Sequence, residues 1–265
     1  MALIDSHCHL DFPVFDDDRD VVVQRARDVG VTGILVPGVA PATWGRVLAV
    51  RERYGGMIRV ALGLHPHALP ALSEAQVDAG LAGLAHRLLA EDACAVGECG
   101  LDGLLVKRGV PWERQEAVLS AQLTVARRLD LPVVLHCVKA HGRLLALLEA
   151  GGPIAGVVHA WTGSAEMTAR FAALGLHFGF GGAITRANAR RPLEAAAAAP
   201  ADRVLLETDA PDMAPRGAAF ALPVPGRNEP MMVAAFAARL RELRGAPLHD
   251  NSALFGFVGA DTDAS

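Results

Sequence analysis

Histidines and carboxylates recur in this 265-residue chain with the spacing that metal centres use. The clearest signal is the pair His7 and His9, which follows the first apolar segment. Alternate residues of a strand point to the same side, so both imidazoles can bind one ion while Cys8 faces away. Imidazole and carboxylate ligands without thiolate suit divalent ions such as Zn, Mn or Mg. The remaining candidate ligands each follow a later apolar segment: Glu98, His136, His159 and Asp209.

The segments that must position these residues alternate between two kinds. Continuously apolar runs predict eight buried strands, at residues 2–5, 33–37, 58–62, 93–96, 132–135, 156–158, 176–180 and 204–206. Stretches with helical spacing lie between them, for example at residues 20–29, 115–129, 141–149, 165–174 and 191–199. This alternation in about 250 residues predicts a closed (β/α)8 TIM barrel that forms a single domain over residues 1–265. A doubly wound open sheet is the alternative, but no glycine fingerprint follows the first strand.

Barrel enzymes place reactive groups at the carboxyl ends of their strands, so we expect the candidates to converge there. Glu98 would be a costly buried anion unless it bridges two ions, which predicts a two-metal site. His136 and His159 end consecutive strands and should be neighbours, although each alone is compatible with a hydrogen-bonded core histidine. Asp209 ends the last strand and can reach the ion of the histidine pair; its alternative role is a helix N-cap. Glu207 precedes it on the same side and can orient a ligand or water.

Composition excludes several classes of protein. Hydrophobic residues make up 52% and charged residues 20% of the chain, as in a folded domain. No apolar run approaches the roughly 20 residues that span a bilayer, and residues 1–9 do not resemble a signal peptide. The four cysteines lack C-x-x-C spacing, which favours reduced thiols in a cytoplasmic protein. We expect Cys8, Cys99 and Cys137 to pack away from the barrel axis, and a net charge of −4 gives no global signal for nucleic acid.

At the level of motifs, the chain resembles the TatD-like metal-dependent deoxyribonucleases of the amidohydrolase superfamily. The resemblance is collinear from the start to about residue 257. The matching stretches are IDSHCHLDFPVFDDDRD (4–20), ALGLHPH (61–67), AVGECGLD (95–102), LPVVLHC (131–137), GVVHAWTGS (156–164), GFGGAIT (179–185), LLETDAPDMAP (205–215) and GRNEP (226–230).

The resemblance implies a TIM barrel, two divalent metals and phosphodiester hydrolysis. It assigns His7, His9, Glu98 and Asp209 to one ion, and Glu98 with His136 and His159 to the other. It also implies that His65 lies near the substrate phosphate. We expect attack by a metal-activated water, with Asp209 as the base and Glu207 as the alternative base. Glu98, Asp209 and Glu207 are thus the expected catalytic carboxylates, and no G-x-S-x-G nucleophile elbow is present.

Arg227 follows the last strand in a loop rich in proline and glycine, where barrel enzymes often bind phosphate. A guanidinium has no lone pair for a metal but forks onto phosphate oxygens, so we expect Arg227 to contact the substrate. The alternative is an ion pair with Glu229 or another carboxylate.

The chain also departs from the family pattern. Trp161 and Thr162 stand where a phenylalanine-serine pair is usual, and Asp212 where an aromatic residue is common. The segment before Asn251 is about ten residues short, which could loosen the last helix. These changes leave the ligands in place and put substrate preference in question.

Three functions are compatible with these residues. The leading one is a two-metal phosphodiesterase acting on DNA, in particular a 3′ exonuclease. The second is an amide or ester hydrolase acting on a small molecule or an aminoacyl-ended nucleic acid, since fold alone does not fix function. Such barrels often bridge their metals with a modified lysine, whereas Glu98 occupies that position here. The third is a metal-binding protein without catalysis, which would need a closed coordination shell.

Overall fold

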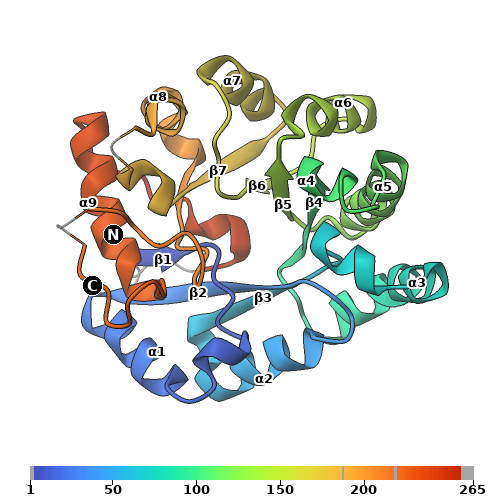
Figure 1. The fold of residues 1–265 in the computed structure, drawn as a ribbon, viewed down its shortest axis with the longest axis horizontal. Coiled ribbons are helices and arrows are strands. Elements are labelled where there is room, and N and C mark those ends of the chain that lie inside the picture. Colours follow the sequence, from blue (N-terminus) through green and yellow to red (C-terminus); the bar gives the residue numbers. More distant parts are fainter. Residues whose placement is uncertain (1–2, 187, 218–219, 258–265) are drawn as a thin grey trace, which may run out of the picture.

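Eight parallel strands form one sheet with the order β1 to β8 in a computed structural model, which describes residues 3–186, 188–217 and 220–257. Figure 1 shows the strands at the centre with the helices around them. The strands are β1 (Leu3–Asp5), β2 (Val31–Gly38), β3 (Ile58–Leu62), β4 (Ala95–Asp102), β5 (Val133–Val138), β6 (Gly156–Val158), β7 (Leu176–Phe180) and β8 (Val204–Leu206).

Hydrogen bonds between the first and last strands bring the two edges of the sheet together. The backbone N–H of Ser6 donates to the carbonyl of Leu206 at 2.9 Å. The buried carboxylate of Asp5 accepts the backbone N–H of Thr208 at 2.8 Å and its hydroxyl at 2.5 Å. The expected closed barrel is confirmed.

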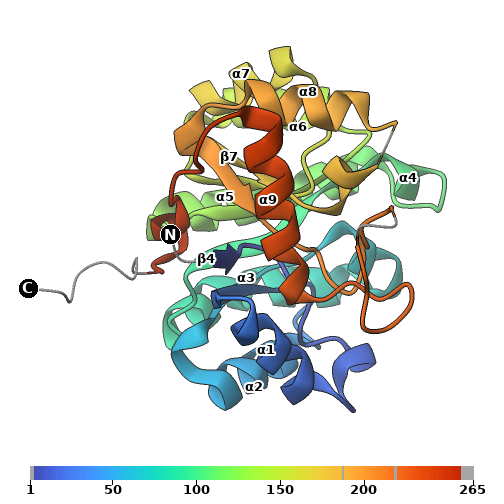
Figure 2. The same cartoon turned by 90° about the vertical axis from the view of Figure 1, so that its left-hand side faces the viewer.

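Helices connect successive strands and cover the outside of the barrel. They are α1 (Arg19–Asp28), α2 (Trp44–Tyr54), α3 (Glu74–Ala90), α4 (Gly103–Val106), α5 (Trp112–Leu129), α6 (His141–Gly151), α7 (Ala165–Ala173), α8 (Arg190–Ala198) and α9 (Val233–Arg244). Short 3-10 helices cover Pro13–Phe15, Gly55–Met57, Pro66–Ala71, Gly182–Thr185, Ala201–Arg203, Pro230–Met232 and Ser252–Phe255. In the side view of Figure 2, α9 runs between α1 and α8. No helix in the described ranges is long and apolar enough to cross a membrane.

Two apolar clusters make up the core. The larger one lies between the strands and the helices. The smaller one takes one residue from each of six strands and two phenylalanines from the C-terminal segment. It contains Leu35, Ala61, Ala95, Val134, Val157, Leu205, Phe255 and Phe257. This packing fills the interior of the barrel, as in other barrels of this size, and leaves polar residues at the carboxyl ends of the strands.

The structure refines the predicted elements. Four strands have the predicted bounds, at 58–62, 156–158, 176–180 and 204–206. Strand β4 is the main difference, because it continues from Ala95 to Asp102 and so places Glu98 inside the strand rather than at its end. Residue 2, expected to begin the first strand, lies outside the described residues. The short segment before Asn251 does not leave α9 loosely packed, because Val233, Phe236, Ala237 and Leu240 are all buried.

Candidate metal centre

Five strands or the segments that follow them bring the six predicted ligands to one end of the barrel. His7 and His9 follow β1, Glu98 lies in β4 and His136 in β5; His159 follows β6, and Asp209 follows β8. Four of these residues are buried, and His136 and Asp209 are half-buried. The polar ends of the strands thus converge as the sequence suggested.

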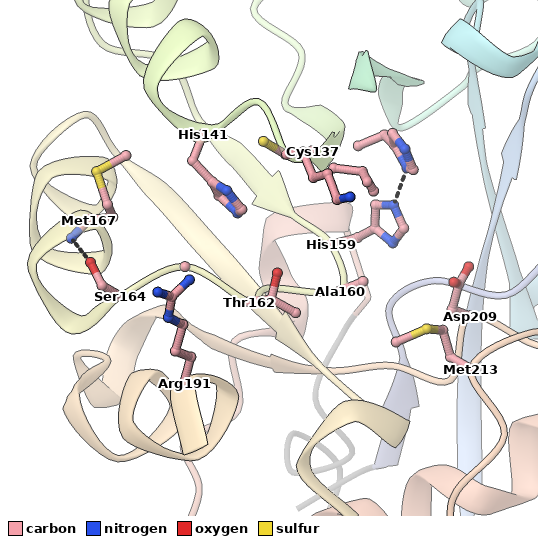
Figure 3. A pocket seen from close by; sticks show the side chains of 14 residues that line it. Cys137, His141, His159, Ala160, Thr162, Ser164, Met167, Arg191, Asp209 and Met213 are labelled. Atoms are coloured by element: carbon pink, nitrogen blue, oxygen red, sulfur yellow. Dashed lines mark hydrogen bonds between the residues drawn. The ribbon is translucent and has the colours of Figure 1, made fainter. Parts of the chain in front are cut away.

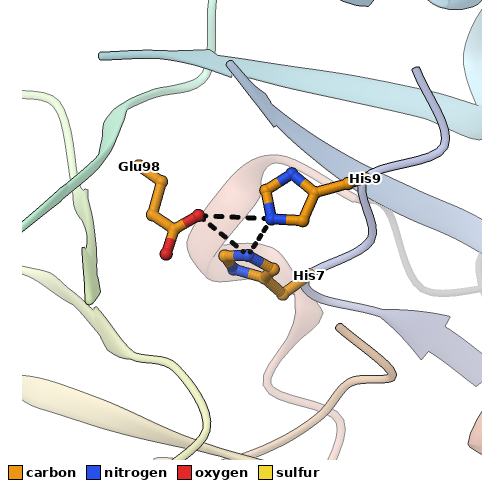
Figure 4. A group of neighbouring side chains, drawn as sticks. All are labelled: His7, His9 and Glu98. Carbon is orange, nitrogen blue, oxygen red and sulfur yellow. Dashed lines mark hydrogen bonds and ion pairs between the residues drawn. The ribbon is translucent and has the colours of Figure 1, made fainter. Parts of the chain in front are cut away.

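One carboxylate oxygen of Glu98 faces the first histidine pair. Its Oε2 lies 3.3 Å from Nε2 of His7 and 3.3 Å from Nε2 of His9 (Figure 4). The two imidazole nitrogens are also 3.3 Å apart. Three donor atoms therefore surround one point, an arrangement that suits a single cation.

The other oxygen of Glu98 faces a second group of histidines. Its Oε1 lies 2.8 Å from Nε2 of His159, 3.2 Å from Nδ1 of His136 and 3.1 Å from Nε2 of His65. The carboxylate of Glu98 thus lies between two groups of imidazoles and presents a different oxygen to each. A carboxylate in this position can bridge two ions.

Asp209 also approaches the first histidine pair. Its Oδ1 is 3.5 Å from Nε2 of His7 and 3.7 Å from Nε2 of His9. It also belongs to a compact group with His7 and His159, whose ligand atoms all lie within 4.8 Å of one another. No helix begins at residue 210 in the described chain, so the alternative N-cap role of Asp209 does not occur.

The residues of the site fit divalent metal ions. Among the described residues, the buried Nδ1 atoms of His7 and His9 have no hydrogen-bond partner, while their Nε2 atoms face each other. Two neutral imidazoles that both present Nε2 lone pairs repel unless a cation or a proton lies between them. The surrounding donors are imidazole nitrogens and carboxylate oxygens, which suit Zn, Mn and related ions.

Electrostatics in the site are dominated by burial and by Glu98. Burial lowers the pKa of His65 to about 4 and lowers the pKa of His7 well below its usual value. At His159 burial acts in the same direction, but the charge and hydrogen bond of Glu98 outweigh it and raise the pKa to about 10. Burial opposes ionisation of Glu98, yet the surrounding histidines hold its pKa well below the usual value. Glu98 is therefore ionised, as a ligand must be.

Glu207 lies behind His159 rather than among the ligands. Its Oε1 accepts the backbone N–H of Ala160 at 2.5 Å and lies 3.9 Å from Nδ1 of His159. Burial raises the pKa of Glu207 to about 8. Gly179 makes room for this carboxylate, because a Cβ at that position would lie 1.8 Å from Oε2 of Glu207.

Two polar residues of this region, Asp102 and His67, were not predicted to have a role. Asp102, at the end of β4, has its Oδ2 2.6 Å from Nε2 of His67 and 3.4 Å from Nε2 of His136. Asp102 is buried, and its hydrogen bonds hold its pKa below the usual value despite burial. Both residues belong to motifs that end predicted strands, so their position at the rim was the available signal.

Arg227 is paired with carboxylates in the structure. Its guanidinium forks onto Asp18 at 2.9 and 2.5 Å, contacts Glu229 at 2.8 Å and lies over the ring of Phe15. The alternative interpretation, pairing with neighbouring carboxylates, is the one that the structure shows. The loop is nevertheless tied to the site, because Nδ2 of Asn228 donates to the carbonyl of Thr208 at 2.7 Å.

No cysteine belongs to any candidate metal group within the described ranges. Cys8 and Cys99 are fully buried in the outer core, and Cys137 is nearly so. Trp161 is also buried, with its indole N–H donating to Thr168 at 2.8 Å. Three residues differ from the family pattern near the site: Trp161, Thr162 and Asp212. Of these, only Thr162 lines the open space beside the site.

That open space is a cavity of about 700 Å³. His136, His159 and Asp209 border it on the side of the candidate metal centre. Figure 3 shows Asp209 on one side of the cavity and Arg191 with Ser164 on the other. The site is therefore open to a substrate from the side of β5 to β8.

Comparisons with known proteins agree with this architecture. Residues 4–255 match the family described as TatD related DNase. The chain is 40% identical to the uncharacterized metal-dependent hydrolase YjjV of Escherichia coli K12, over 92% of this chain and 91% of that protein. It is 37% identical to the 3′-5′ ssDNA/RNA exonuclease TatD of Pectobacterium parmentieri, over 87% of both chains. The crystal structure of the E. coli YjjV protein, described as a TatD homologue, superposes with a TM-score of 0.80 at 39% identity and covers 92% of this chain and 91% of its own.

A closed barrel with histidines and carboxylates gathered around Glu98 defines a metal-dependent hydrolase. The chain belongs to the TatD family of these enzymes.

Proposed function

We propose that this enzyme hydrolyses phosphodiester bonds of single-stranded nucleic acid with two divalent ions, as a 3′ exonuclease. The observation that carries the proposal is the position of Glu98, whose two oxygens face two separate groups of histidines. A bridging carboxylate of this kind is typical of two-metal phosphoryl chemistry. Relatives named 3′-5′ ssDNA/RNA exonuclease support the substrate and the polarity.

The chain offers a distinct set of ligands for each ion. We assign His7, His9 and Asp209 to the first ion, His136 and His159 to the second, and Glu98 to both. When bound, such ions would lower the pKa of a water and stabilise negative charge on the phosphate oxygens. Zn and Mn suit these ligands best, and Mg is tolerated.

The protein residues supply the proton transfer and the positioning. Asp209 is the base, because it lies at the edge of the cavity and burial raises its pKa, which favours proton acceptance. Glu207 lies beyond His159, 3.9 Å from its Nδ1, and acts on that ring through charge, with a role as base the alternative. His65 approaches Glu98 from β3, and we keep it as the contact for the substrate phosphate.

The test compares substrates on metal-defined protein. Enzyme purified without added metal is analysed for metal content, then assayed on single-stranded oligonucleotides labelled at either end, on bis(p-nitrophenyl) phosphate and on p-nitrophenyl acetate. We expect about two ions per chain, shortening of oligonucleotides from the 3′ end and loss of activity with chelator. Turnover of the acetate ester with no phosphodiester hydrolysis would instead favour an amide or ester hydrolase.

A matched variant separates the metals from the fold. Glu98→Gln keeps the shape of the side chain but removes the charge that both ions share. We expect loss of at least one ion and of nearly all phosphodiester hydrolysis, with an unchanged circular dichroism spectrum. A fully active Glu98→Gln enzyme would contradict the two-metal assignment.

A further inference from the structure

The cavity beside the candidate metal centre extends well beyond the groups that the proposed reaction uses. One side is formed by His136, His159 and Asp209, and the far side by residues of α7, α8 and the segments before them. Its volume of about 700 Å³ lies within the range of pockets that bind small molecules. A single phosphate at the metals would leave most of this space unfilled.

The charge of the cavity changes from one side to the other. Asp209 is the single carboxylate among the described lining residues, and it lies at the metals. Lys139 and Arg191 are the cations of the lining, and both side chains are exposed to solvent. No carboxylate pairs with either of them in the part of the chain that the structure describes. The neighbouring Arg190, by contrast, pairs with Glu194 at 2.8 Å and does not line the cavity.

Lys139 occupies a backbone conformation that disfavours its side chain. Its φ of 52° lies in the left-handed region, which costs a residue with a Cβ about 1 kcal/mol or more. It follows His136 by three residues and comes directly after β5, so the candidate ligand and this cation lie near the same strand end. It is one of two lysines among 25 cationic residues. A conformation of this kind at a rim residue is typical of functional positions.

The remaining lining suits a sugar and a base rather than a second ion. Met167 and Met213 supply apolar surface, and Thr162 supplies an exposed hydroxyl. The hydroxyl of Ser164 is already engaged, because it accepts the backbone N–H of Met167 at 3.2 Å and caps α7 (Figure 3). Apolar walls with a few polar groups and two cations fit one nucleotide unit with its phosphate.

We propose that this cavity is a subsite for the nucleotide next to the scissile bond, with Lys139 and Arg191 binding its phosphodiester group. The inference rests on the proposed function and adds to it two cations that have no carboxylate partner among the described residues. Arg191 can fork onto two phosphate oxygens, and Lys139 supplies a point charge to the same cavity. The enzyme then requires a substrate with at least two phosphodiester groups for full activity.

The test uses the full-length enzyme with Lys139→Gln, Arg191→Gln and the double variant, and Arg190→Gln as the matched control on the same helix. The substrates are a thymidine trinucleotide with two phosphodiester groups, a dinucleotide with one, and bis(p-nitrophenyl) phosphate. We expect kcat/KM on the trinucleotide to fall about 10- to 100-fold more than on the other two substrates, the range for hydrogen bonds to a charged group. The control should show no such difference.

Salt dependence gives a second and independent measurement. Loss of one phosphate contact should reduce the slope of log kcat/KM against log salt concentration by about 0.7 for single strands. Equal losses on all three substrates, or an unchanged slope in the double variant, would overturn the subsite. A wild-type enzyme that cleaves none of the three would contradict the proposed function itself, which is a different result.

Discussion

Glu207 lies on the far side of His159 from Glu98. Its Oε1 is 3.9 Å from Nδ1 of His159, while Nε2 of the same ring is 2.8 Å from Oε1 of Glu98. The imidazole is thus placed between two carboxylates, one in the candidate metal centre and one behind it. At 3.9 Å Glu207 makes no hydrogen bond to this ring, and its charge helps to raise the pKa of His159.

The variant Glu207→Gln should therefore weaken metal binding without removing a ligand. Partners of this type change metal affinity by about 10- to 100-fold. We expect a fall of that size at the second ion, measured by competition with a chelating dye, and recovery of kcat when metal is added in excess. If activity is abolished while both ions stay bound at normal affinity, Glu207 is the base instead.

The variant Asp209→Asn should act mainly on turnover. Loss of a general base costs about 10²- to 10⁴-fold in rate. The amide oxygen of asparagine can still approach the first ion, so we expect at least one bound ion, a nearly unchanged KM and a kcat reduced within that range. Near-normal kcat would show that Asp209 does not accept the proton.

The variant Gly179→Ala should disturb Glu207, because the added Cβ would lie 1.8 Å from Oε2. We expect destabilisation of about 1–3 kcal/mol from overpacking, together with weaker metal binding. Gly83→Ala is the control, since Gly83 lies inside α3 with no atom within 4 Å of the new Cβ. It should stabilise the protein by about 0.5–1 kcal/mol. Denaturant unfolding measures the stability of both variants. A Gly179→Ala protein as stable as the wild type would mean that the Glu207 carboxylate can move.

The variant Arg227→Ala should lower stability more than it affects substrate binding. It leaves Glu229, which is fully buried, with Arg25 alone. We expect a loss of about 1–3 kcal/mol, and a smaller loss for Arg190→Ala, whose pair with Glu194 is exposed. A raised KM on oligonucleotides with unchanged stability would restore the substrate contact expected from the sequence.

Replacing Cys8, Cys99 and Cys137 together by alanine should leave metal content unchanged. All three side chains are turned to the outer core, and burial raises the pKa of each thiol. We therefore also expect the native thiols to react slowly with alkylating reagents at neutral pH. Loss of a metal ion in the triple variant would show that one of these sulfurs is a ligand.

The sequence predicted the barrel well because its strands are short, apolar runs between helical segments. Site residues could be placed wherever a polar residue ended such a run, as with His159 after β6. Glu98 was harder, because β4 continues through a polar stretch to Asp102 and nothing local shows that the strand persists. Arg227 could not be placed, because its partner Asp18 is 209 residues away and an unpaired and a paired arginine have the same sequence signature.

The closure of the barrel also bears on the order in which the enzyme becomes active during synthesis. His7 emerges early, but Asp209 and the bonds from Asp5 to Thr208 come from a segment made some 200 residues later. A growing chain that stops before β8 therefore has an open sheet edge and a metal centre that lacks Asp209. Such contacts between distant residues form late and slowly. Completion of the first ligand group should therefore coincide with the meeting of β1 and β8.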